Sequence, residues 1–77
     1  MVVEAVHYSV VLFHSMTGAL HAEKLFKNSG IAIKLIPVPR HLSSDCGICL
    51  RFDRRDETGV REILAREQME IQGIHSV

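Results

Sequence analysis

The 77-residue sequence has only two cysteines and no long apolar run, and these shortages exclude several classes of protein. Two cysteines at C-x-x-C spacing are too few and too close together to staple a small secreted domain. The longest apolar stretch, residues 10–13, is far too short to span a bilayer. Glu4 and His7 stand where a secretory signal would have basic residues and then an apolar run, so we expect no targeting peptide. We therefore expect a cytoplasmic protein with reduced thiols.

The sequence also lacks an excess of either charge, since it has nine basic and nine acidic residues. A neutral domain has no overall attraction to nucleic acid or to an anionic membrane. One local group of basic residues is interleaved with acidic residues, and we interpret it as a solvated surface of mixed charge. This group consists of Arg40, His41, Arg51, Arg54 and Arg55, interleaved with Asp45, Asp53, Asp56 and Glu57. We expect neither nucleic acid nor a membrane as a partner.

A chain of 77 residues has room for a single domain, which we assign to residues 1–77. A domain of this size buries only about 60% of the surface that its unfolded chain exposes, so its stability is marginal. The hydrophobic fraction of 47% is ample for a core and argues against disorder. We expect further stability to come from self-association, which makes a homodimer the expected assembly.

The first half of the sequence predicts a strand, a helix and a second strand. Residues 6–13 are rich in β-branched and aromatic side chains and become apolar on both alternating sets, as in a central strand. Ser15 or Thr17 can cap the helix that follows. The apolar face of this helix consists of Ala19, Ala22 and Phe26. Residues 31–36 alternate as a strand, which we expect Pro37 to end because proline cannot donate to a ladder.

The second half predicts a loop, a strand, a helix and a last strand. Residues 37–45 form the loop, and residues 48–52 resume the strand pattern. A polar turn then leads into a short amphipathic helix, with Thr58 as the candidate N-cap and an end near Met69. The apolar positions of this helix are Val60, Ile63 and Leu64. Residues 71–77 form the last strand.

The order β-α-β-β-α-β is the split βαβ pattern of ferredoxin-like domains. Right-handed crossovers then place both helices on one face of a four-stranded antiparallel sheet, so the predicted fold class is an α+β sandwich. In this topology the loops at residues 14–17 and 37–47 meet at the same end of the sheet. We therefore expect Cys46 near the positive N-terminus of the first helix.

The sharpest chemical feature is the C-x-x-C pair of Cys46 and Cys49. In a straight strand these two side chains would point to opposite faces, although Gly47 permits a bend at Cys46. If Ile48, Leu50 and Phe52 face the helices, Cys49 and Arg51 face the open side of the sheet. A thioredoxin-type motif begins a helix, whereas this pair begins a strand, which weakens a dithiol interpretation. We interpret Cys49 chiefly as a small apolar residue.

Cys46 is the candidate nucleophile, because a helix N-terminus and nearby cations favour a thiolate. The candidate cations are Arg40, His41 and His14, and the amides after Ser43 and Ser44 can assist them. The alternative is an unreactive loop cysteine.

The sequence gives little support for a metal site, because its five histidines are scattered. Only His14 and His41 can reach the cysteine pair, whereas zinc in structural sites takes four protein ligands. His21 and His75 are expected at the surface. Nothing resembles a phosphate-binding glycine loop, a paired-carboxylate site or a Ser-His-Asp arrangement. We expect no metal and no cofactor.

Several segments together resemble the selenium/sulfur carrier-like proteins, a family of small bacterial domains. The matching segments are residues 12–15, 22–25, 30–31, 35–40, 43–47 and 50–52. The most specific is Pro-x-Pro-Arg-x-x-Ser-Ser-x-Cys-Gly, which ends at Gly47. The resemblance implies that Cys46 accepts sulfur or selenium as a persulfide or selenosulfide and hands it on, in a loop shaped by Arg40, Ser43, Ser44 and Gly47. The family pattern requires the first cysteine and not the second.

The leading hypothesis is therefore a chalcogen carrier that works with donor and acceptor proteins and is not a stand-alone enzyme. Its candidate catalytic residues are Cys46, Arg40 and Cys49, and its candidate substrate-binding residues are His14, Ser15, His41, Ser43, Ser44 and Gly47. One alternative is an interaction module that dimerises through an apolar open sheet face. Another is a redox or metal site that uses both cysteines.

Overall fold

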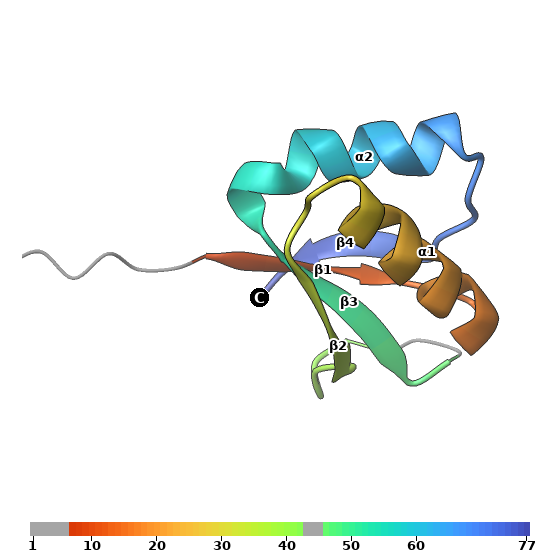
Figure 1. The fold of residues 1–77 in the computed structure, drawn as a ribbon. Helices are drawn as coiled ribbons and strands as arrows, with labels where there is room; N and C mark the ends of the chain where they lie inside the picture. The colour runs from red at the N-terminus through yellow and green to blue at the C-terminus, as the bar shows by residue number, and fades with distance from the viewer. Residues whose placement is uncertain (1–6, 43–45) are drawn as a thin grey trace, which may run out of the picture.

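The computed structural model describes residues 7–42 and 46–77 (Figure 1). The elements of this part are β1 (Tyr8–Leu12), α1 (Met16–Asn28), β2 (Ile33–Pro37), β3 (Ile48–Asp53), a 3-10 turn η1 (Arg54–Asp56), α2 (Glu57–Arg66) and β4 (Gly73–Ser76). The strands form one antiparallel sheet in the order β2-β3-β1-β4. Figure 1 shows both helices on the same side of this sheet. The ferredoxin-like α+β prediction is confirmed.

Helix α1 begins after Ser15, which is one of the two predicted caps. The Ser15 Oγ accepts a hydrogen bond from the backbone N–H of Gly18 at 3.2 Å, which satisfies one donor of the first turn. The predicted apolar face is confirmed, since Ala19, Ala22 and Phe26 are fully buried. This face packs α1 onto the sheet.

Strand β2 differs from its predicted end, because Pro37 is its last residue and pairs with Ile48. The prediction placed the stop one residue too early. β2 lies at the edge of the sheet, where a residue without an N–H is tolerated. The backbone pairing even continues past it, since the Val38 N–H donates to the Gly47 carbonyl at 3.1 Å.

Helix α2 begins and ends earlier than predicted. The chain leaves β3 through η1, where the Asp53 side chain accepts from the Arg55 N–H, and α2 starts at Glu57. Thr58 is therefore inside the helix and is not its cap. The helix ends at Arg66, and Gln68 adopts a φ of 53°, so the chain has already turned before Met69. Neither described helix has the length and apolar character that crossing a membrane requires.

The buried side chains form two clusters on the two faces of the sheet. The larger cluster lies between the sheet and the helices and contains Val11, Phe13, Ala19, Ala22, Phe26, Leu50, Phe52, Val60, Ile63 and Leu64. The smaller cluster contains Val10, Leu12 and Cys49, against which Ile36, Val38 and Leu42 pack. We call this smaller group the loop-covered cluster, because residues 38–42 lie outside the strands and help to cover it. The sheet is therefore buried on both faces at one end.

Candidate functional site

The strand register brings the two candidate loops to one end of the sheet. Leu12, the last residue of β1, pairs with Cys49, and Pro37, the last residue of β2, pairs with Ile48. The segment between β1 and α1 and the segment between β2 and β3 therefore lie at the same end of the sheet, as the topology predicted. Cys46 lies at this end, two residues before β3 begins.

Cys46 is half-buried at a bend in the backbone. Gly47 has a φ of 74°, a left-handed value that favours glycine, so the chain turns directly after Cys46. The Cys46 side chain packs against the helix-side cluster, and its Sγ donates a hydrogen bond to the Ile48 carbonyl at 2.9 Å. Because Cys46 is only partly covered, a reagent or partner can approach its thiol.

Cys49 is in a different environment, although it is only three residues away. It belongs to the loop-covered cluster and has no exposed surface. Burial, together with the nearby Cys46 charge, raises the pKa of the Cys49 thiol to about 11. A thiol with this pKa is neutral near pH 7 and is a poor nucleophile. Both cysteines are thiols, and no disulfide joins them.

Arg40 and His41 occupy the corner of a turn in the loop before Cys46. The Leu42 N–H donates to the Pro39 carbonyl at 2.9 Å, which closes the turn and leaves both Arg40 and His41 exposed. Leu42 itself packs on the loop-covered cluster. The turn is thus fixed to the face that buries Cys49, whereas Cys46 packs toward the helices. The predicted site residues Ser43 and Ser44 lie outside the described residues.

The remaining predicted site residues lie where β1 passes into α1 or beside Cys46. His14 is exposed, and so is Ser15, whose side chain caps α1. Gly47 is exposed at the bend, and a Cβ at this position would meet no atom within 4 Å. Glycine is therefore favoured there by the positive φ and not by a lack of space. Across residues 7–42 and 46–77, no group of three or more His, Cys, Asp or Glu side chains is arranged to hold a metal ion.

The comparison with protein families gives a match over residues 8–76 to the family described as "Putative Se/S carrier protein-like". The match covers every helix and strand of the fold. The chain belongs to this Se/S carrier protein-like family. Comparisons with curated proteins and with solved structures gave no match.

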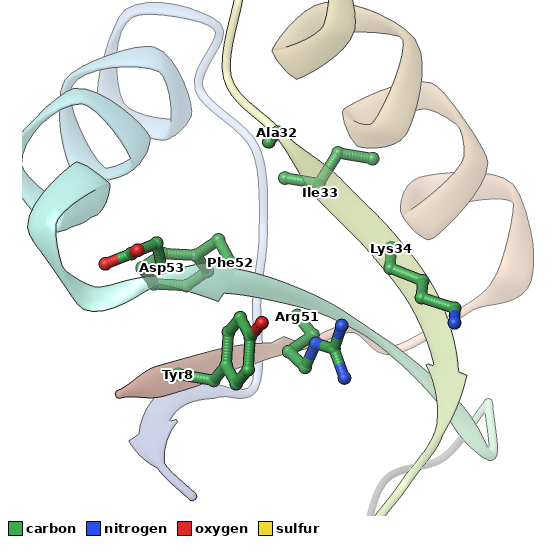
Figure 2. Close-up of a pocket in the computed structure, with 7 residues that line it drawn as sticks. All are labelled: Tyr8, Ala32, Ile33, Lys34, Arg51, Phe52 and Asp53. Atoms are coloured by element: carbon green, nitrogen blue, oxygen red, sulfur yellow. The ribbon is translucent and has the colours of Figure 1, made fainter. Parts of the chain in front are cut away.

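This Se/S carrier-like domain has a second feature, at the opposite end of the sheet from the cysteines. An open pocket of about 230 Å³ is lined by Tyr8, Ala32, Ile33, Lys34, Arg51, Phe52 and Asp53 (Figure 2). The Arg51 guanidinium lies over the Tyr8 ring, 4.1 Å from its centroid. Lys34 is the register partner of Arg51 across β2 and β3.

Sequence reasoning missed this second feature, because it treated Arg51 as part of a solvated mixed-charge surface. Alternation alone placed Cys49 and Arg51 on the face away from the helices. The register between β2 and β3, which puts Lys34 opposite Arg51, depends on the folded sheet. A signal that could have found it is the single cation in each of the two predicted strands, residues 31–36 and 48–52, which are otherwise apolar.

Proposed function

We propose that this domain is a sulfur or selenium carrier in which the Cys46 thiol accepts the chalcogen atom. The observation that carries the proposal is the contrast between the two cysteines. Cys46 is only partly buried and lies at a bend, whereas Cys49 is fully buried and has a pKa raised to about 11. Membership of the Se/S carrier-like family supports the same assignment.

The proposed step is an exchange at sulfur that needs no further oxidant. The Cys46 thiolate attacks the outer sulfur of a persulfide on a donor protein, and a new S–S bond forms at Cys46. The S–S bond within the donor persulfide breaks, and the donor cysteine leaves as a thiolate. The reverse exchange with an acceptor thiol passes the atom on. A selenosulfide would exchange in the same way, with selenium as the atom attacked.

Loading requires the Cys46 side chain to change its contacts. Its Sγ donates to the Ile48 carbonyl at 2.9 Å, and a thiolate has no proton with which to keep that bond. The thiolate is therefore expected to turn away from Ile48 toward donors or cations. We propose that Arg40, His41 and His14 supply positive charge, and that the amides after Ser43 and Ser44 supply donors. The exposure of Arg40, His41 and His14 is compatible with this role.

The contacts of Cys49 and Ser15 indicate that these residues stabilise the structure around Cys46 and do not react themselves. Cys49 fills the loop-covered cluster, so a dithiol mechanism would require that cluster to open. Ser15 caps α1 and thereby fixes the helix N-terminus at the Cys46 end of the sheet. We assign the chemistry to Cys46 alone and treat Cys49 as part of the support for the loop.

The expected partners are a donor protein and an acceptor protein, and the expected compartment is the cytoplasm of a bacterium. A carrier with one exchangeable thiol has no reaction to complete on its own, so we do not expect stand-alone enzyme activity. A homodimer also remains our expectation for so small a domain. The apolar face that suggested sheet-to-sheet dimerisation is already covered within one chain, since Val10 and Leu12 are 0% and 3% exposed. Light scattering at high concentration tests the dimer, and a strict monomer would contradict it.

The deciding experiment measures the intact mass of the reduced protein after exposure to a persulfide donor. We expect the wild-type chain to gain the mass of one sulfur, Cys46→Ser to gain none, and the matched variant Cys49→Ala to load nearly as well as wild type. Mapping of alkylated peptides should place the added atom on Cys46. Equal loss of loading in both variants would instead indicate a dithiol mechanism. No mass gain in any variant would refute the carrier proposal.

A further inference from the structure

Two cations oppose each other on the sheet face away from the helices. Lys34 in β2 and Arg51 in β3 are register partners, and their neighbours Leu35 and Leu50 face the other way, toward the helices. Directly opposed side chains of like charge destabilise an antiparallel pair. Lys34 and Arg51 make no ion pair with a carboxylate among the residues that the structure describes. The folded domain therefore contains a pair of like charges that no ion pair within residues 7–42 and 46–77 neutralises.

Arg51 contacts Tyr8 through a cation–π interaction. The guanidinium lies over the aromatic ring at 4.1 Å from the centroid, as Figure 2 shows. A guanidinium has five N–H donors, and those that do not point at the ring stay available to bind an anion. Arg51 is thus prepared to donate two parallel hydrogen bonds to one oxyanion.

The carboxylate in the same pocket does not neutralise this charge. Asp53 accepts hydrogen bonds from the Arg55 backbone N–H at 2.9 Å and from the Arg55 guanidinium at 3.0 Å. These bonds hold the pKa of Asp53 below its usual value, so it is ionised and already paired. In Figure 2 its oxygens point away from Arg51 and Lys34. The pocket therefore keeps the positive charge of both cations.

We propose that Lys34, Arg51 and Tyr8 form a docking site for an acidic segment of a partner protein, with a Glu or Asp carboxylate bound between the two cations. A carboxylate matches the fork of an arginine and adds a point contact to lysine. The proposal goes beyond the carrier function and does not require Cys46 to accept a chalcogen.

A protein segment fits this pocket better than a small anion or a nucleic acid. The pocket is open to water, so a lone anion would gain only two screened contacts, whereas a protein adds contact area. Bases bind to aromatic side chains by stacking, and Arg51 already covers one face of the Tyr8 ring. The pocket also lies only about 13 Å along β1 from the cysteine end of the sheet. An interface of standard size, about 800 Å² per partner, can cover both.

The sequence supplies a direct reporter for the test. Tyr8 is the single tyrosine, and there is no tryptophan, so the intrinsic fluorescence of the chain reports on this site. The probe is a capped tetraglutamate peptide, with capped tetraglutamine as its neutral match. We expect tetraglutamate to change the Tyr8 fluorescence and to shift the backbone amide resonances around Lys34 and Arg51, with millimolar affinity. Tetraglutamine should do neither. A rise in salt from about 0.05 M to about 0.5 M should weaken binding severalfold.

Three variants and one control distinguish the site from general electrostatic attraction. Arg51→Gln should weaken binding about tenfold, since it removes charge-assisted hydrogen bonds. Lys34→Gln should weaken it about threefold, because it removes one exposed charge and leaves the Tyr8–Arg51 stack. Arg51→Lys keeps the charge but loses the fork, so it should still weaken binding. The control is Arg61→Gln, which removes one charge from α2, where Arg61 pairs with Glu57 at 2.9 Å, and should change nothing.

Several outcomes would overturn the proposal. Equal weakening by Lys34→Gln and Arg61→Gln would mean that net charge and not this site attracts the peptide. An equal response to inorganic phosphate would make the pocket a small-anion site. Tighter binding of a short single-stranded RNA than of tetraglutamate would point to nucleic acid. The Cys46→Ser variant should bind the peptide like wild type, so failure of the carrier proposal leaves this result intact.

Discussion

The two faces of the sheet are buried in different ways. The cluster on the helix-covered face includes Ala19, Ala22 and Phe26 from α1 and Val60, Ile63 and Leu64 from α2. Among residues 7–42 and 46–77, the opposite face is covered at its cysteine end by Val38 and Leu42, and it carries Lys34, Arg51 and Tyr8 at its other end. Most of the buried apolar side chains of the described residues therefore lie on the helix-covered face.

The two cysteines divide between these faces, and this explains why they differ. The backbone bends at Gly47, Cys46 packs at the margin of the helix-side cluster, and Cys49 points into the loop-covered cluster. One thiol remains accessible while its neighbour is sealed. Strand alternation places Cys49 on the face away from the helices, whereas Cys46 precedes β3 and takes its position from the bend at Gly47.

The largest expected effect is on the helix-covered face. Phe26→Ala removes a fully buried ring between α1 and the sheet, and the resulting cavity should lower the free energy of unfolding by about 3–5 kcal/mol. Denaturant unfolding measures the loss. The matched control is Leu20→Ala on the same helix, which is 47% exposed and should change stability by less than about 0.5 kcal/mol. Similar losses in both variants would contradict the assignment of the core to this face.

The next effect concerns Cys49 and alkaline pH. Its pKa is about 11 in the folded chain against 9.0 for an ordinary thiol, so the unfolded chain ionises first as the pH rises. The contribution of Cys49 to the free energy of unfolding is therefore constant below pH 9 and falls as the pH rises from 9 to about 11. The free energy of unfolding should fall by at most about 1.4 kcal/mol per pH unit in this range, and by less if water screens the thiolate.

The measurement is the free energy of unfolding of wild type and of Cys49→Ala across this pH range. Lysines also titrate there, so the difference between the two curves isolates the Cys49 contribution. We expect wild type to lose stability relative to Cys49→Ala as the pH rises. Parallel curves for wild type and Cys49→Ala would mean that Cys49 is not sealed.

A smaller effect tests what covers Cys49. Leu42→Ala shortens a half-buried side chain that packs on the loop-covered cluster, and it should cost about 1 kcal/mol of stability. The more informative readout is the rate at which iodoacetamide labels Cys49, which should rise while the Cys46 rate changes little. Arg40→Ala, in the exposed corner of the same turn, is the control and should leave Cys49 protected. An unchanged rate in Leu42→Ala would show that the strands alone protect Cys49.

Local pattern predicted the helix-covered face well. The α1 residues Ala19, Ala22 and Phe26 recur at helical spacing, and all three are buried. The expected facing of Leu50 toward the helices and of Cys49 away from them is also confirmed. These features follow from the repeat of 3.6 residues per turn in a helix and of two residues in a strand, and both repeats are visible within a single segment.

The features that sequence reasoning missed depend on contacts between segments. The cover over Cys49 forms because the turn at residues 39–42 directs Leu42 onto β1 and β3, which no local pattern specifies. Pro37 stays in its strand only because β2 is an edge. The early start of α2 depends on η1 after Asp53, a turn that a hydrophobic pattern cannot reveal.

The smallest expected effect tests the repulsion between Lys34 and Arg51 on the sheet face away from the helices. Lys34→Glu replaces a like-charged cross-strand pair by an opposite-charged pair with Arg51, so it should raise the free energy of unfolding by about 0.5 kcal/mol at low salt. Lys34→Gln removes only the repulsion and should gain less. The same two variants should weaken tetraglutamate binding, and Lys34→Glu should weaken it more than Lys34→Gln. A gain in stability together with a loss of binding would mean that the cations are retained for docking, because the fold is more stable without their repulsion. A loss of stability in Lys34→Glu would mean that Lys34 supports the fold instead.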